Sequence, residues 1–472
     1  MKIATRLKVG SSSLGVPEWA LRFGHDTGPR DPGAAHRRAA APTVYASRHM
    51  DRSLRAVLAG TFTLRFSTGL TGAMLAVYLA KLPEHGGPVV AATTLALLHT
   101  TFYVAELVLS PAFGVISDRL GHHRVMLFGP AFGAIAVILT GLTTNLAVLG
   151  GTRLLEGAST AASIPSILGF IAAVTAGNEL LRGKAAARFE GATLAGIGAG
   201  FAVAPLLFAA LGPVAFFLNA GFYGVSFLIY RFGVADHDAE ERAARAAAQE
   251  PRVDWRRYKA LLGTSHVWLL AQTWIAVNAA IGLWFSQSIF QFSKPDRRFP
   301  DQALLRGFSP VEISVAAVVI GILFGAGLLY WGNRFKNMRR TTILLYGILG
   351  GGVLALGGIA VNHGAALPLI VPILGGAAAV FGLFVLAGAT PAALGLLADI
   401  SEKFPTDRGA IMGLYSVFLA IGQIVGALLG GVAADWRGID GLLIGTFGLL
   451  LIALLPLAQL RRDEDQLTAA VA

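Results

Sequence analysis

The sequence contains no cysteine among its 472 residues, and only 14% of its residues are charged. The absence of cysteine excludes disulfide bonds, thiolate chemistry and Cys-ligated zinc or iron–sulfur centres. Soluble domains usually carry about 25% charged residues, so the scarcity of charge argues against a water-soluble enzyme. The sequence also has no phosphate-binding loop and no Ser/His/Asp arrangement, so ATP hydrolysis and acyl transfer find no support. We therefore expect no enzyme, no cofactor and no metal.

Long apolar runs dominate the sequence instead, since hydrophobic residues make up 55% of it and 58 further residues are glycine. A transmembrane helix needs about 20 mainly apolar residues, and Gly or Pro within the run does not exclude it. The runs are continuous and do not alternate with polar residues, which indicates helices rather than strands. We predict an all-α integral membrane protein with twelve spans, at 56–80, 89–113, 125–143, 146–174, 190–211, 213–232, 266–291, 310–331, 341–361, 367–398, 409–433 and 440–460.

The distribution of basic residues predicts the orientation of these spans. Thirty of the 38 Lys and Arg residues lie on the side that carries both termini, and six lie on the opposite side. Cytoplasmic loops of membrane proteins are enriched in Lys and Arg. The net charge of +11 is therefore read as a topology signal and not as a nucleic-acid surface. We expect a monomeric, multi-pass protein of the plasma or inner membrane, with both termini in the cytoplasm.

Two polar segments interrupt the apolar pattern. The N-terminal segment is rich in Gly, Pro and Arg and has no apolar run that is long enough for a signal peptide. Met50 lies directly before the first span and is a candidate alternative start of translation. The second polar segment is a long charged linker, whose Ala/Glu/Arg part predicts an amphipathic helix. The predicted domains are a disordered cytoplasmic tail (1–49), a six-helix bundle (50–232), a cytoplasmic linker (233–265), a second six-helix bundle (266–460) and a cytoplasmic tail (461–472).

The two bundles resemble each other in sequence. A pattern that begins at Pro165 recurs at Pro391, an offset of 226 residues, and a second pattern that begins at Asp118 recurs at Asn333, an offset of 215. Both patterns fall at equivalent junctions between a helix and a loop. We infer a duplicated six-helix unit and hence two pseudosymmetric bundles, an arrangement that places the binding site between the halves near the bilayer midplane.

The loop between the second and third spans carries a specific motif. It reads Gly114-Val-Ile-Ser-Asp118-Arg119-Leu-Gly121-His-His-Arg124. This motif resembles the signature loop of the major facilitator superfamily, G-x-x-x-D-R-x-G-R-R/K. The resemblance extends over nearly the whole chain when the helix number, the linker and the repeat are included, and the chain resembles the 12-helix drug:proton antiporter-like members of the family. It implies the major facilitator fold.

The resemblance also implies that this loop is a conformational latch. Asp118 is then expected near the positive N-terminus of the eleventh span, around Arg408. Arg119 and Arg124 are expected to pair with a carboxylate such as Asp399, or to hold a lipid phosphate. The alternative interpretation is a positively charged membrane anchor that contains a turn.

Two further motifs lie inside helices. Arg153 and Glu156 belong to a pattern that resembles the second motif of the family, in which the Arg faces the central cavity and is linked to proton transfer. Gly191, Gly200 and Pro205 belong to a pattern that resembles the motif of exporters, G-x8-G-x3-G-P-x2-G. The alternative interpretation of the glycines is ordinary packing of helices through small residues. The resemblance therefore favours export.

A related series of glycines occurs in the second half. Gly413, Gly422 and Gly426 repeat the spacing of the first series, which aligns Gly200 with Gly422, and the proline of the motif is lost. The same two interpretations, an exporter motif or small-residue packing, apply here.

Four charged residues are expected inside the membrane, all in the first half. One charge at a helix centre costs about 2.5–3.5 kcal/mol to insert. Arg65 and Glu106 are predicted at the same depth, and we hypothesise that they pair. The pair either only orients the two helices or releases Arg65 when Glu106 takes up a proton. Arg153 and Glu156 are three residues apart on one helix face and can couple in the same way.

The second half offers no charge deep in the membrane. Asn278 is its most plausible polar cavity residue, because an amide in lipid needs a partner. Aromatic side chains at helical spacing in the same region favour packing over contact with a substrate.

These features together predict a secondary active transporter that moves a small amphipathic or apolar organic solute by alternating access. Proton-coupled export is the favoured interpretation, with the proton and the lipid bilayer as its other partners. The alternatives are an uptake permease for a polar metabolite, and a lipid scramblase or sensor that is built on the same scaffold.

Overall fold

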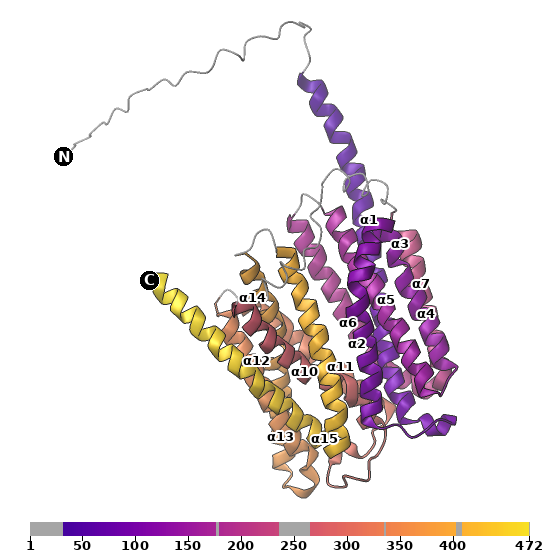
Figure 1. The fold of residues 1–472 in the computed structure, drawn as a ribbon, viewed down its shortest axis with the longest axis vertical. Helices are drawn as coiled ribbons and strands as arrows, with labels where there is room; N and C mark the ends of the chain where they lie inside the picture. Colours follow the sequence, from indigo (N-terminus) through magenta and orange to yellow (C-terminus); the bar gives the residue numbers. More distant parts are fainter. Residues whose placement is uncertain (1–31, 176–178, 236–264, 335–336, 403–407, 472) are drawn as a thin grey trace, which may run out of the picture. The chain divides into compact units, whose positions relative to one another are not determined.

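The computed structural model describes five stretches of the chain, and all of its regular structure is helical (Figure 1). No strand occurs among the residues that are described, so the all-α prediction is confirmed. The described residues are 32–175, 179–235, 265–334, 337–402 and 408–471.

The helices of the first half begin and end at recognisable signals. The side chain of Asn145 accepts hydrogen bonds from the N–H groups of Ala147 and Val148 and so caps the start of α5. Gly121 ends α2 in a backbone conformation with φ of 101°, which favours glycine. The α-helices are α1 (Pro32–Ala80), α2 (Ala92–Leu120), α3 (His122–Met126), α4 (Phe128–Gly141), α5 (Leu146–Val174), α6 (Glu179–Leu211) and α7 (Ala215–Gly233), with 3-10 turns at Leu82–His85 and Gly212–Val214.

The second half is built in the same way. A capping box between Ser309 and Glu312 starts α11. The long helix α15 reverses direction at Arg437 and Gly438, where Gly438 has φ of 58°. The α-helices are α10 (Ser265–Ser293), α11 (Pro310–Asn333), α12 (Arg340–Asn362), α13 (Ile370–Leu386), α14 (Ala389–Glu402) and α15 (Arg408–Val471), with 3-10 turns at Ala303–Leu305 and Gly364–Ala366.

Nine helical stretches among the described residues are long and apolar enough to cross a membrane. Two of them, Lys184–Gly233 with 50 residues and Ser416–Arg462 with 47, are too long for one crossing, because a helix rises about 1.5 Å per residue through an apolar layer of about 30 Å. Each contains a chain reversal and holds two of the predicted spans. The first predicted span, 56–80, lies within α1 and is not among the nine, since Arg65 and several hydroxyl side chains make it more polar.

The structure describes helix in parts of both predicted tails. Helix α1 begins at Pro32, so residues 32–49 are helical rather than part of a disordered tail. This stretch contains a run of alanines, the best helix formers, which outweighs its polar character. Helix α15 continues through the predicted C-terminal tail to Val471. Residues 1–31 and most of the predicted linker, 236–264, lie outside the described residues, so the predictions for them remain untested.

Helices α1 and α6 pack closely through glycine. A side chain at Gly200 would overlap the carbonyl oxygen of Phe66, and a side chain at Gly196 would lie 2.6 Å from the carbonyl oxygen of Phe62. Gly69 on α1 lies in the same way against Ile197 of α6. Two of the helices in the first half are therefore held together by small residues at spacings of three and four.

Helices α10 and α15 repeat this contact in the second half. Gly426 lies against the carbonyl of Ala279, Gly422 against Ile275, and Gly282 against Gln423. Each glycine and each backbone group here has a counterpart in the α1–α6 contact.

The residue numbers of the two contacts show the repeat directly. The α6 and α15 positions differ by 226 and the α1 and α10 positions by 213, with Gly200 matching Gly426 and Phe66 matching Ala279. The predicted duplication is therefore visible in the packing. The correct register pairs Gly200 with Gly426, whereas the motif spacing aligns it with Gly422, which is the counterpart of Gly196.

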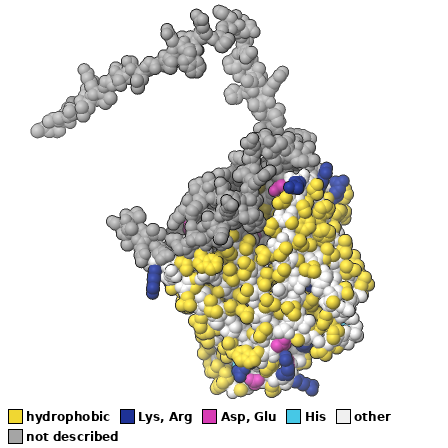
Figure 2. Space-filling view, in the orientation of Figure 1, with side chains coloured by type: hydrophobic (Ala, Val, Ile, Leu, Met, Phe, Trp, Pro, Cys, Tyr) yellow, Lys and Arg dark blue, Asp and Glu magenta, His cyan; other side chains and the backbone are white. Residues whose placement is uncertain are grey.

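The surface fits a membrane environment. In the space-filling view, hydrophobic side chains cover the flank of the described surface, and charged side chains gather near its two ends (Figure 2). Large apolar side chains such as Val108, Ile322 and Leu455 are more than 60% exposed, which in water would be a large apolar patch and in lipid is the favourable state.

Candidate transport site and contacts between the halves

A buried ion pair lies in the N-terminal part of α5. The guanidinium of Arg153 pairs with the carboxylate of Glu156 one helical turn away, and both side chains are nearly inaccessible. The guanidinium also lies over the ring of Phe102 on α2, 4.8 Å from its centroid. The predicted coupling of these two residues therefore takes the form of a direct ion pair. It neutralises both charges within the helix, where either one alone would be unfavourable.

Arg65 and Glu106 are close but do not form the expected pair. Glu106 stands where α2 packs against Gly157 of α5, and Arg65 stands where α1 packs against Gly196 of α6. Both residues are described, and no ion pair within 4.0 Å joins them in this conformation. Their charges nevertheless interact across the space between α1 and α2. The hydroxyl of Tyr103 is within electrostatic reach of both.

A third carboxylate, that of Glu190 of α6, interacts electrostatically with Arg65. Glu190 is not one of the site residues that the sequence predicted. It is exposed although it lies inside the span Lys184–Gly233. Glu190 is eleven residues before Phe201, so the two side chains leave α6 within about 20° of each other. Phe201 contacts Phe285 of α10, 5.6 Å between ring centroids. Glu190 therefore lies on the face of α6 that is directed toward the second half.

Asn278 is the counterpart of Arg65 in the repeat. Both residues touch a glycine of the partner helix, Arg65 at Gly196 and Asn278 at Gly422. The amide of Asn278 donates to the carbonyl of Trp274 in its own helix, at 2.9 Å, and the side chain is buried at the α10–α15 contact. Asn278 was expected to line a cavity, but in this conformation its side chain is packed between α10 and α15. The equivalence places a cation in one half and a neutral amide in the other.

The signature loop has the predicted turn but a different ion pair nearby. Gly121 supplies the positive φ for the turn, whereas a side chain added at Gly114 would make only an ordinary contact with α5, 3.8 Å from Cβ of Pro165. Asp399, the expected partner of the loop arginines, pairs instead with Arg340 at the start of α12. Arg340 belongs to the same half as Asp399 and begins the neighbouring helix α12, so it is better placed to pair with Asp399 than the loop arginines are.

The rest of the latch prediction stays untested. The side chains of Asp118, Arg119 and Arg124 are all exposed. Helix α15 begins at Arg408, but the side chain of this residue lies outside the described part of the chain. A contact between Asp118 and the start of α15 therefore remains a prediction.

Two histidines attach the signature loop to the first half. The hydroxyl of Ser117 is 2.6 Å from Nδ1 of His122, whose ring fills the space left by Gly169 on α5. Nε2 of His123 donates to the carbonyl of Tyr230 on α7, at 3.0 Å. Both imidazoles are buried. They anchor the loop by hydrogen bonds where the family motif has basic residues.

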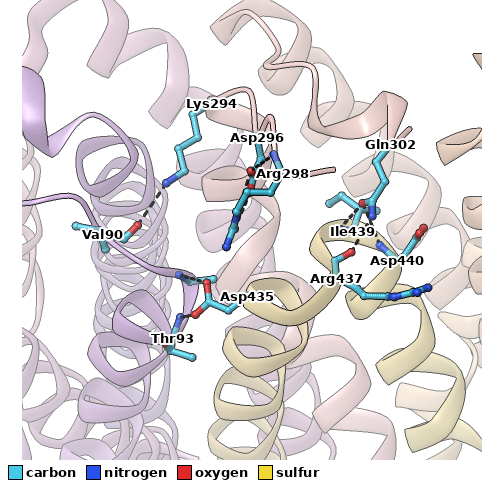
Figure 3. A network of polar contacts seen from close by, with 11 residues as sticks. Val90, Thr93, Lys294, Asp296, Arg298, Gln302, Asp435, Arg437, Ile439 and Asp440 are labelled. Atoms are coloured by element: carbon cyan, nitrogen blue, oxygen red, sulfur yellow. Dashed lines mark hydrogen bonds and ion pairs between the residues drawn. The ribbon is translucent and has the colours of Figure 1, made fainter. Parts of the chain in front are cut away.

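At the opposite end, the second half caps a helix of the first. We call the end with residues 81–91, 294–309 and 434–440 the cap end, and the end with residues 114–124 the motif end. The carboxylate of Asp435 accepts hydrogen bonds from the N–H groups of Ala92 and Thr93, at 3.0 and 2.9 Å (Figure 3). These are the first N–H groups of α2, whose own N-cap residue, Ala91, provides no side-chain bond. A carboxylate at this position is stabilised by the helix dipole.

Two more side chains of the second half bind the same stretch of backbone. The ammonium of Lys294 donates to the carbonyl of Val90 at 3.3 Å, and the amide of Gln287 donates to the carbonyl of Ala92 at 3.2 Å. Burial lowers the pKa of Lys294, and the nearby carboxylates, including Asp435, act in the opposite direction. The two halves are therefore joined at the cap end by polar contacts to one helix start.

Asp435→Ala is expected to open the cap end. It removes two hydrogen bonds to a charged acceptor, worth about 3 kcal/mol or more in total, and so shifts the equilibrium by at least about 100-fold. Spin labels at E84C and R297C, on the cap-end loops of the two halves, report the distance between the halves at this end. The chain has no cysteine of its own, so only these two positions are labelled. Asp435→Asn, which keeps an acceptor and loses the charge, should give an intermediate distribution. An unchanged distance in D435A contradicts the capping role.

The fold and these contacts define a class of protein. Two related helical halves, charges buried in the membrane and polar contacts between the halves at one end are the features of a secondary transporter. A model of the Major Facilitator Superfamily matches residues 57–305 and 299–470, so the chain belongs to this superfamily. It is a multi-pass membrane transporter and not an enzyme.

Two curated relatives are drug-resistance proteins. Multidrug resistance protein 2 of Bacillus subtilis (strain 168) is 25% identical over 357 residues, which cover 73% of this chain and 80% of that protein. Quinolone resistance protein NorA of Staphylococcus aureus (strain MSSA476) is 22% identical over 395 residues, which cover 82% of this chain and 91% of that protein.

Solved structures show the same fold. The nucleoside transporter NupG superposes with a TM-score of 0.65 at 12% identity, covering 87% of this chain and 98% of that one. The peptide transporter POT superposes with a TM-score of 0.63 at 16% identity, covering 87% and 94%. At this identity the likeness concerns the fold alone.

Proposed function

We propose that this transporter exports a small amphipathic organic solute in exchange for protons. The observation that carries the proposal is the set of charges in the first half, in which Arg65 interacts electrostatically with the carboxylates of both Glu106 and Glu190. Each charge is unfavourable in a membrane, so a set of three without a close ion pair within it points to a function that uses the charges. The similarity to two drug-resistance proteins supports export.

In this mechanism Arg65 responds to the protonation of the two carboxylates. A proton that binds to Glu106 neutralises the carboxylate and weakens its attraction for Arg65. The guanidinium is then free to interact with Glu190 or with a polar group of the solute. The buried pair of Arg153 and Glu156 holds α5 beside α2 and takes no proton in this scheme. The aromatic contact of Phe201 with Phe285 provides an apolar wall that suits an amphipathic solute.

The proposed orientation places the motif end in the cytoplasm and the cap end outside, in a plasma membrane. The excess of Lys and Arg on the side of the motif end supports this assignment. This conformation would then be closed to the outside, with Asp435, Lys294 and Gln287 holding the closed gate.

Inverted membrane vesicles provide the test. A vesicle lumen made acidic should drive accumulation of a fluorescent cationic or neutral amphipathic dye, and collapse of the pH gradient should abolish it. Solute accumulation in vesicles whose exterior, rather than lumen, is acidic would indicate proton symport, as in an uptake permease. Movement of labelled phospholipid in liposomes, without movement of the dye, would indicate a scramblase. Either of these two outcomes overturns the proposal.

A further inference from the structure

Three potential metal ligands meet at the cap end of the second half. They come from three different connections: Asp301 from the loop between α10 and α11, His363 from the end of α12, and Asp440 from the start of the second arm of α15. One ligand atom from each lies within 4.8 Å of the other two. The Nε2 of His363 is 2.9 Å from Asp440, and its Nδ1 is 3.5 Å from Asp301.

The surrounding residues hold Asp440 in place. The fully buried amide of Asn362 donates to one carboxylate oxygen of Asp440 at 2.8 Å, and Nε2 of His363 lies 3.1 Å from that oxygen and 2.9 Å from the other. The amide oxygen of Gln302 accepts from the N–H groups of Ile439 and Asp440, at 2.9 and 3.3 Å (Figure 3). Carboxylates that ligate metals are themselves usually fixed by such outer hydrogen bonds. The position of Asp440 is therefore preorganised by its neighbours.

We propose that Asp301, His363 and Asp440 bind a divalent cation of borderline softness, with Zn²⁺ as its best representative. Imidazole nitrogen and carboxylate oxygen are both ligand types that Zn²⁺ accepts, and solvent supplies the fourth ligand. Ligand atoms around a tetrahedral Zn²⁺ lie about 3.3 Å apart. The ligand atoms here lie within 4.8 Å of one another, and the two carboxylates face different nitrogens of His363, so binding requires Asp301 to move toward the nitrogen that faces Asp440. The side chain of Asp301 is 64% exposed and is free to make this movement, whereas that of Asp440 is 12% exposed and fixed.

Bound metal would stiffen the elements that hold the cap end closed. The loop that carries Asp301 also carries Lys294, and Asp440 lies five residues after Asp435, just beyond the reversal at Arg437 and Gly438. Lys294 and Asp435 contact the start of α2. A cation that joins their two elements should therefore favour the closed gate, and a cation added from the cap-end side should inhibit transport.

Isothermal titration of the detergent-solubilised full-length protein with Zn²⁺ tests the site. The affinity tag must contain no histidine. We expect one Zn²⁺ per chain, and His363→Ala should weaken binding at least about tenfold, the lower range for damage to a metal site. Asp301→Asn should weaken it as well, and this exposed residue is a substitution that the fold tolerates.

His85→Ala is the matched control, because His85 is an exposed histidine at the same end of the protein. It should bind Zn²⁺ as the unaltered protein does. The proposal is overturned if the unaltered protein binds no Zn²⁺, or if H363A and D301N bind it as tightly as H85A. Because the readout is binding, it does not depend on the proposed direction or coupling of transport.

Discussion

Arg153→Ala should strongly destabilise the protein. It leaves the carboxylate of Glu156 buried without its cation, and breaking a buried pair by removing one partner costs about 3–5 kcal/mol. The structure provides no substitute, since one oxygen of Glu156 already lacks a hydrogen-bond partner within the described structure. The contact of the guanidinium with Phe102 is lost at the same time. Thermal unfolding of the solubilised protein measures the loss.

The double variant R153A/E156A separates the pair from its members. With both charges removed, no uncompensated charge remains, so the double variant should be markedly more stable than R153A alone. Arg153→Lys keeps the charge and loses the planar contact with Phe102. Its thermal stability should therefore lie between that of the unaltered protein and that of R153A. If R153A and R153A/E156A are equally unstable, the ion pair contributes nothing beyond packing.

Glu106→Gln should abolish transport that is driven by a pH gradient while the protein still binds its solute. The substitution preserves the shape of the side chain and mimics the protonated carboxylate, so Arg65 is released permanently and can no longer respond to protons. The measurement is dye accumulation in proteoliposomes with an imposed gradient, beside counterflow of the dye without a gradient. Glu84→Gln, at an exposed loop position, is the control and should leave both activities unchanged.

The same assay decides between a structural and a proton-coupling role for Glu106. In a structural role, E106Q would lower thermal stability and would reduce driven transport and counterflow alike. In a coupling role, stability and counterflow survive and only the response to pH disappears. Glu190→Gln should show the same selective loss if Arg65 moves between the two carboxylates. Unaltered pH-driven transport in both variants would exclude the proposed mechanism.

Much of the fold could be predicted because its determinants are local. Apolar runs of sufficient length must become helices in lipid, where every backbone group needs an internal partner. The coupling of Arg153 and Glu156 was also predictable, since three residues along a helix bring two side chains to the same face. The repeat was found at the right offset, 226, from patterns at the helix ends.

What the sequence did not indicate depends on contacts between distant segments. The cap that Asp435 forms on α2 joins residues more than 340 positions apart, and nothing in its neighbourhood marks it. Glu190 is hard to recognise because the predicted span begins at this residue, whereas α6 begins eleven residues earlier at Glu179. The glycines of the exporter motif are aligned by spacing, and only the packing shows that Gly200 corresponds to Gly426.

The central claim is that two related halves open alternately at the cap end and the motif end. Double electron–electron resonance tests it with two label pairs on the otherwise cysteine-free chain, E84C/R297C at the cap end and L120C/N333C at the motif end. A shift of pH or the addition of a transported solute should lengthen one distance and shorten the other. Distances that stay fixed, or that lengthen and shorten together, would contradict the claim.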